Sequence, residues 1–192
     1  MKQEIYYFEK PGPQNTKKTL EIARKRAKEL DIDQVVVAST HGNTGFKALD
    51  VFQNTNVRVV VVTISHAFKK EGWVMEDEVR KKLNEKGALV VTTLHALGDD
   101  VNFAFTSGQR AAAFNAVIRE TLYRFCQGMK VCVEITLMAV ESGATDVNKE
   151  VIAVAGTNEG ADTAVVIKPA YARDFLGLEI REILAKPRQT SD

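Results

Sequence analysis

The sequence has few cysteines and no segment of the kind that directs a protein for export. Its 192 residues include only Cys126 and Cys132, which are six positions apart and form no C-x-x-C motif. In apolar surroundings these residues are typical of buried free thiols in a reducing cytoplasm, rather than of a disulfide or a metal-binding pair. The N-terminus carries an acidic side chain and no signal-peptide core, so we expect a cytoplasmic protein.

Long apolar runs and an excess of charge of one sign are missing too. The apolar runs, such as 57–62, fall far short of the ~18 residues that a membrane-spanning helix needs. The 26 basic and 25 acidic residues leave a formal net charge of +1, which gives no electrostatic case for nucleic acid or an anionic membrane. The nucleotide-binding signatures G-x-x-x-x-G-K-[ST] and G-x-G-x-x-G are also absent.

What the chain does contain is a regular alternation of β-branched runs with amphipathic segments. The predicted strands, numbered one to five, cover 34–39, 57–62, 88–91, 151–155 and 164–168. The predicted helices cover 16–30, 45–53, 75–86, 111–125 and 129–142. Strands that alternate with helices predict an α/β fold, with a mostly parallel sheet covered on both faces.

The domain organisation follows from length and composition. With 192 residues, 45% of them hydrophobic and 27% charged, the chain fits a single α/β domain over 1–192. We expect 1–14 to form an N-terminal arm and 187–192 a polar tail, while 178–186 is a candidate for one further edge strand. The segment 129–142 alternates as a strand would, but its length and the capping Gly143 favour a buried helix.

Four of the predicted strands end in hydroxyl or glycine residues. Strand one runs into Ser39 and Thr40, strand two into Thr63, strand three into Thr92 and Thr93, and strand four into Gly156 and Thr157. In a parallel sheet these ends share one edge, and open α/β sheets bind ligands outside that edge. The alternative is that threonine is merely a good strand residue and serine a good helix cap. That alternative does not explain why the pattern coincides with glycine-containing loops after strands one and four.

The loop after strand one has the character of a phosphate site. A flexible connection from a buried strand to a helix N-terminus presents unpaired N–H groups and partial positive charge. Lys47 could reach a phosphate there or be an ordinary solvated lysine, and Arg110 could clamp an anion near another helix start that Ser107 caps. This loop comprises Ser39, Thr40, His41, Gly42, Asn43 and Thr44.

All three histidines of the chain, His41, His66 and His95, follow predicted strands. Each is a candidate for ligand contact or proton transfer, or is an uninvolved loop residue. No carboxylate recurs at consistent spacing with them, so we expect no metal site.

The chain resembles a known family in two loops. Residues 35–42, with the helix and strand that follow, resemble the strand, T-x-S-G-x-x loop, helix and strand that open the pyruvate kinase C-terminal domain. Residues 156–163 resemble the effector loop of that domain, and overall the chain resembles a stand-alone, mainly archaeal family of this type. The resemblance implies a three-layer α/β/α fold with a mixed five-stranded sheet, order 3-2-1-4-5, whose last strand is antiparallel. Strands one and four would then be neighbours.

The same resemblance implies flavin mononucleotide (FMN) as the ligand and, because the catalytic barrel is missing, no pyruvate kinase activity. The phosphate would lie on the first loop, and the ribityl chain or ring near the second. Asp162 could accept a hydroxyl or be an ordinary turn residue. The candidate FMN-binding set is Ser39, Thr40, His41, Gly42, Asn43, Thr44, Thr63, Gly156, Thr157, Gly160, Ala161, Asp162 and Thr163.

Three functions stay open on the sequence. The first is a binding or regulatory module for a phosphorylated small molecule. The second is a flavin-dependent or phosphate-handling enzyme that uses the same edge, with one of the three histidines as proton donor. The third is a subunit that serves as an interaction surface, and the sequence leaves a homo-oligomer open.

Overall fold

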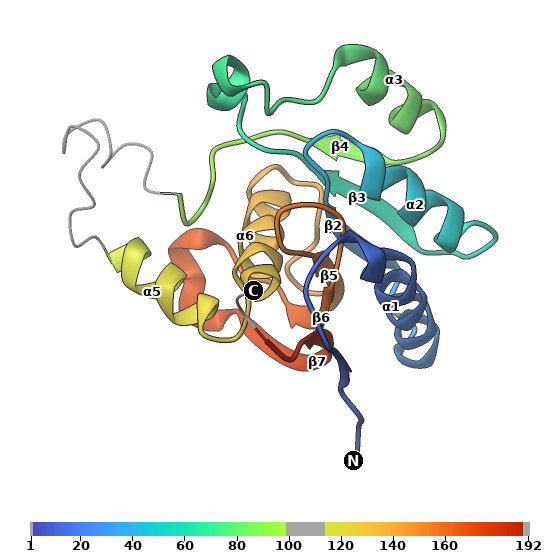
Figure 1. Ribbon diagram of the computed structural model, residues 1–192, viewed down its shortest axis with the longest axis vertical. Helices are drawn as coiled ribbons and strands as arrows, with labels where there is room; N and C mark the ends of the chain where they lie inside the picture. The colour runs from blue at the N-terminus through green and yellow to red at the C-terminus, as the bar shows by residue number, and fades with distance from the viewer. Residues whose placement is uncertain (1, 99–113, 190–192) are drawn as a thin grey trace.

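The computed structural model of the protein describes residues 2–98 and 114–189. Helices cover both faces of one twisted sheet (Figure 1). The strands are β1 (Tyr6–Phe8), β2 (Gln34–Ala38), β3 (Arg58–Val62), β4 (Leu89–Val91), β5 (Val151–Ala155), β6 (Thr163–Lys168) and β7 (Glu179–Pro187). The helices are α1 (Thr16–Leu30), α2 (Asn43–Phe52), α3 (Asp77–Glu85), α5 (Phe114–Tyr123) and α6 (Gln127–Glu141), with 3-10 turns η1 (Pro13–Asn15), η2 (His66–Glu71) and η3 (Ala172–Gly177). Within the described ranges, no helix has the length and apolar character to cross a membrane.

Over the described residues, the sheet has seven strands in the order β1-β7-β6-β5-β2-β3-β4. The five predicted strands are β2 to β6, and they stand in the predicted order, with β5 and β6 antiparallel. The prediction of a five-stranded sheet ending in that antiparallel strand is wrong, because β7 pairs with β6 and β1 pairs with β7.

The two extra strands come from segments whose sequences carry only a weak strand pattern. Strand β7 confirms a strand at 178–186, but it is not the predicted edge strand, because β1 pairs with its other side. Its pairing with β6 has register shifts. Strand β1 lies in the segment interpreted as an irregular arm, where Pro11 and Pro13 follow closely, and it has only three residues. Phe8 is opposite Pro187, so the first residue of the predicted polar tail lies in the sheet.

Two hydrophobic layers flank the sheet. On β2, Val35 and Val37 face the layer formed with α1, α2 and α3, while Val36 faces the layer formed with α6. Successive side chains of a strand point to opposite faces, so a strand buried on both sides is apolar throughout. This explains the β-branched runs and confirms helices on both faces of a mixed sheet (Figure 1).

The helix α6 confirms the interpretation of 129–142 as a buried helix. Gly128, which follows the predicted helix 111–125, lies in the first turn of α6. A Cβ at that position would approach the Oγ1 of Thr163 to 2.2 Å, so the glycine allows α6 to lie close to β6. The predictions on Ser107 and Arg110 fall outside the described residues.

Candidate functional site

The connection between β2 and α2 is shaped by a glycine in a left-handed conformation. Gly42 has φ 93°, and a Cβ there would lie 2.4 Å from the Cγ1 of Val79 on α3. The Oγ of Ser39 accepts a hydrogen bond from the N–H of Gly45 at 3.2 Å. Among the described residues, no partner is found for the N–H groups of Asn43 and Thr44. The α2 N-terminus therefore keeps open donors of the kind that bind anions.

The connection between β5 and β6 lies beside this loop, because β2 pairs in parallel with β5. The carboxylate of Asp162 accepts hydrogen bonds from the N–H of Gly12 at 3.1 Å, the N–H of Thr157 at 3.2 Å and the hydroxyl of Thr163 at 2.8 Å. It is fully buried. Asp162 therefore connects the loop between β5 and β6 to the N-terminal segment and to the start of β6 through hydrogen bonds.

A cavity of about 610 Å³ opens at this carboxyl edge of the parallel strands. The predicted residues that line it are Ser39, Thr40, His41, Asn43, Thr44, Thr63, Gly156 and Gly160. The other predicted residues, Gly42, Thr157, Ala161, Asp162 and Thr163, do not line it but shape and support its loops. Contact of any of these residues with FMN stays a prediction.

One wall of the cavity comes from α6, which we did not expect. Its lining residues form a single helical stripe: Gln127, Lys130, Val131, Glu134, Ile135 and Met138. The available signal was a pair of opposite charges four residues apart in an otherwise apolar helix. Lys130 and Glu134 form an ion pair in which both residues are buried, 7% and 4% exposed. The second oxygen of Glu134 accepts the N–H of Leu97 at 3.1 Å.

Aromatic rings form the rim on the β3 and β4 side. Phe68 stacks against Trp73 and His95, with ring centroids 6.1 and 5.5 Å apart. Trp73, which is 53% exposed, and His95 both line the cavity. Nearby, Thr63 shares a hydrogen bond of 2.6 Å with Thr92.

The three histidines are not brought together in one cluster. His41 and His95 line the cavity, whereas His66 begins the turn η2 outside the lining. The Nε2 of His95 accepts the N–H of Ser65 at 3.3 Å. In the described part of the chain, no group of three histidine, cysteine or acidic side chains is placed to hold a metal ion.

Both cysteines are free and buried, Cys126 directly before the first residue of α6 and Cys132 within that helix. Burial raises the pKa of the Cys126 thiol, and it raises the pKa of the Cys132 thiol well above its usual value. Since the thiolate is the nucleophilic form, neither cysteine is suited to nucleophilic chemistry at neutral pH.

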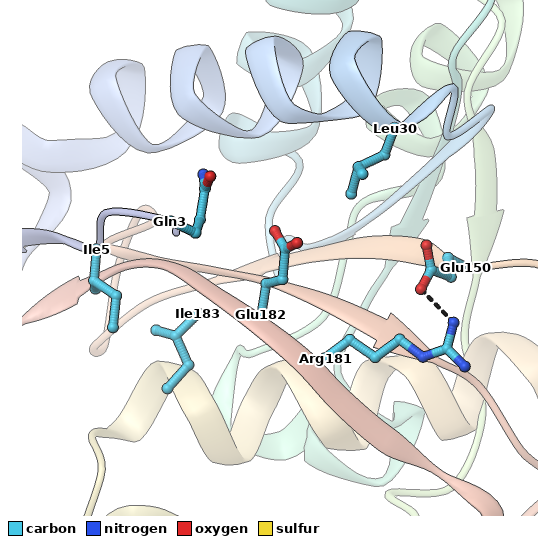
Figure 2. A pocket seen from close by; sticks show the side chains of 7 residues that line it. All are labelled: Gln3, Ile5, Leu30, Glu150, Arg181, Glu182 and Ile183. Carbon is cyan, nitrogen blue, oxygen red and sulfur yellow. Dashed lines mark hydrogen bonds and ion pairs between the residues drawn. The ribbon is translucent and has the colours of Figure 1, made fainter. Parts of the chain in front are cut away.

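A second hollow, of about 630 Å³, lies between the N-terminal segment, the end of α1 and β7 (Figure 2). Its charged groups are paired with protein groups. Arg181 donates to Glu150 at 2.6 Å, and Glu182 accepts two hydrogen bonds from Arg26, at 2.7 and 2.6 Å. These contacts raise the pKa of both guanidinium groups. With its charges satisfied internally, this hollow is the weaker candidate for a ligand site.

Among solved structures, those of pyruvate kinase are similar to this chain over a part of their length. No protein-family model matches it. Two crystal structures of pyruvate kinase from Cryptosporidium parvum resemble it at 13% and 14% sequence identity, with TM-scores of 0.40 and 0.38. The matches cover 79% and 76% of this chain, which spans only 22% and 21% of the length of those proteins. A likeness this weak carries no argument beyond the mixed α/β fold that the structure itself shows.

Proposed function

We propose that the protein binds a phosphate-bearing small molecule, FMN in particular, at the carboxyl edge of its sheet, as a binding or regulatory module. The observation that carries the proposal is the α2 N-terminus with its open N–H groups, which lies in the wall of a cavity. Backbone donors and the helix dipole bind phosphate without burying a compensating side-chain charge. Lys47, which also lines the cavity, adds a cation at the same end.

The rest of the cavity suits a planar ring better than a bare sugar phosphate. Its volume of about 610 Å³ lies within the range of ~300–1,000 Å³ found for small-molecule sites. Apolar residues of α6 and the ring of Trp73 line it beyond the phosphate end. FMN combines a phosphate, a hydroxylated chain and a flat ring system, so each part would meet a wall of matching chemistry.

A flavin-dependent or phosphate-handling enzyme is the second candidate. It is favoured by one observation, namely that His41 and His95 line the cavity. A neutral imidazole can exchange a proton near neutral pH. Reduced nicotinamides should then reduce the bound flavin, whereas a binding module should leave it oxidised with every donor tried.

The proposal is tested by thermal melts with FMN and with inorganic phosphate, together with the absorbance spectrum of the purified protein. Ligand at 100 times its Kd should stabilise the fold by about 2.7 kcal/mol through mass action. Thr44→Val, which removes one lining hydroxyl, should weaken FMN binding about fivefold, the equivalent of one neutral hydrogen bond.

Thr145→Val is the matched control for that variant. The Thr145 hydroxyl is buried without a partner among the described residues and lies near the opposite edge of the sheet, where Gln34 and Arg58 contact Ala144. This variant should leave FMN affinity unchanged. Melts that neither FMN nor phosphate shifts would overturn the proposal.

A further inference from the structure

The cavity wall contains a buried pair of opposite charges that packing alone does not require. Lys130 and Glu134 lie one turn apart on α6, whose other residues are mostly apolar. Burying two charges costs more in desolvation than placing apolar side chains at the same positions. Glu134 also accepts the N–H of Leu97, which gives the carboxylate a structural use. That use does not need a lysine.

The ammonium of Lys130 has more N–H donors than the described residues satisfy. It carries three N–H donors, and among the described residues only Glu134 accepts from it. Lys130 is 7% exposed, so bulk water does not supply the missing acceptors freely. The side chain lines the cavity. A buried cation with unused donors at a cavity wall is complementary to an oxygen acceptor on whatever fills that cavity.

The position of Lys130 separates it from the phosphate end. Helix α2 lies on the face of the sheet that carries α1 and α3, and α6 lies on the other face (Figure 1). A ligand held at the α2 N-terminus therefore reaches Lys130 by extending across the carboxyl edge. The rim residues Trp73 and His95 border the same cavity, which suits a flat ring.

We propose that Lys130 donates a hydrogen bond to a carbonyl oxygen on the non-phosphate end of the bound ligand. The site then takes two-ended ligands, with a phosphate at the α2 N-terminus and a planar, carbonyl-bearing ring against α6. This inference rests on the proposed function and specifies which end of the ligand each wall recognises.

The test compares FMN with inorganic phosphate in the double variant Lys130→Met with Glu134→Gln. The double change leaves no unpaired buried charge, and glutamine keeps an acceptor for the N–H of Leu97, so the variant should fold; a thermal melt checks this. Trp73 is the only tryptophan of the chain and lines the cavity, so its emission reports binding directly. FMN affinity should fall about tenfold or more, as expected for a charged hydrogen bond, while phosphate affinity stays within about twofold.

The control is the double variant Lys149→Met with Asp33→Asn. This pair has the same charges, with N and O atoms 2.6 Å apart, but is exposed and adjoins the amino ends of β2 and β5. It should leave the affinity for FMN and for phosphate unchanged. Wild-type affinity for FMN in the Lys130 and Glu134 double variant would overturn the inference alone. Equal losses for FMN and phosphate would also overturn it, by assigning Lys130 to the phosphate end. Wild-type protein that binds phosphate but no FMN would overturn this inference, and wild-type protein that binds neither would overturn the proposed function as well.

Discussion

At the scale of single residues, Gly42 controls the backbone path from β2 into the helix that carries the open donors. Gly42→Ala should lower the free energy of unfolding by about 2–4 kcal/mol, because alanine at φ 93° is strained and its Cβ meets Val79. The same change should weaken FMN binding, since the loop must shift. Urea denaturation and the Trp73 emission titration measure the two effects.

Gly87→Ala is the matched control for this prediction. Gly87 has φ 94°, almost the same as Gly42, but a Cβ added there would meet nothing within 4 Å. Its cost should be only that of the left-handed conformation, about 1–2 kcal/mol. An equal loss in the two variants would show that contact with Val79 contributes nothing.

The positions of several site residues were predictable from the sequence, but the directions of their side chains were not. The loop composition pointed to Ser39, Asn43 and Thr44, and the structure places all three along the cavity. The direction of a side chain was not predictable, and Asp162 turns into the protein to accept three hydrogen bonds. Lys130 was missed because a charged residue on a buried helix indicates a partner without indicating a cavity.

At the scale of elements, Asp162 joins the N-terminal segment, the second loop and β6. Asp162→Asn should lower the free energy of unfolding by about 1.5–3 kcal/mol, because an amide offers one oxygen where two charged oxygens accepted three donors. The exposed Asp174→Asn in η3 should change it by less than about 0.5 kcal/mol. Urea denaturation of both variants measures the difference.

The same variant separates support from ligand contact. If Asp162 only holds the loop, FMN affinity measured well below the melting temperature should change by less than about threefold. That is less than the effect of losing one hydrogen bond to the ligand. A loss of tenfold or more in a folded variant would restore the role of hydroxyl acceptor that the sequence suggested.

Elements with strong periodicity were predictable, and those stabilised by distant partners were not. The β-branched run of β2 and the apolar α6 carry their own signals. Strand β1 has three residues and depends on pairing with β7, far away in the chain. Such a strand has almost no local signal, because its hydrogen bonds come from tertiary structure alone.

At the scale of the whole molecule, the sheet should show a gradient of stability from centre to edges. Among the described strands, β2, β3, β5, β6 and β7 are paired on both sides, whereas β1 and β4 form the edges. Native-state hydrogen exchange should give the slowest amide exchange in β2 and β5, at the free energy of global unfolding. Amides of β1 should exchange faster through local opening. Uniform protection from β1 to β4 would show instead that the sheet opens as one unit.

The strand order was predictable only through the resemblance to a known fold. Periodicity identifies strands and helices but does not say which strands are neighbours, and the placement of β2 beside β5 is what brings the two loops together.

The pairing of β1 with β7 also constrains how the chain can be made. Tyr6–Phe8 leaves the ribosome first among the strands, yet it pairs with Ala185, Lys186 and Pro187. The hydrogen bonds between the amide of Gly12 and Asp162, and between the amide of Arg188 and Phe8, likewise form only after Asp162 and Arg188 have been synthesised. The residues of β2, β3 and β4 can therefore pair early, whereas β1 stays without its partner strand until β7 has been synthesised.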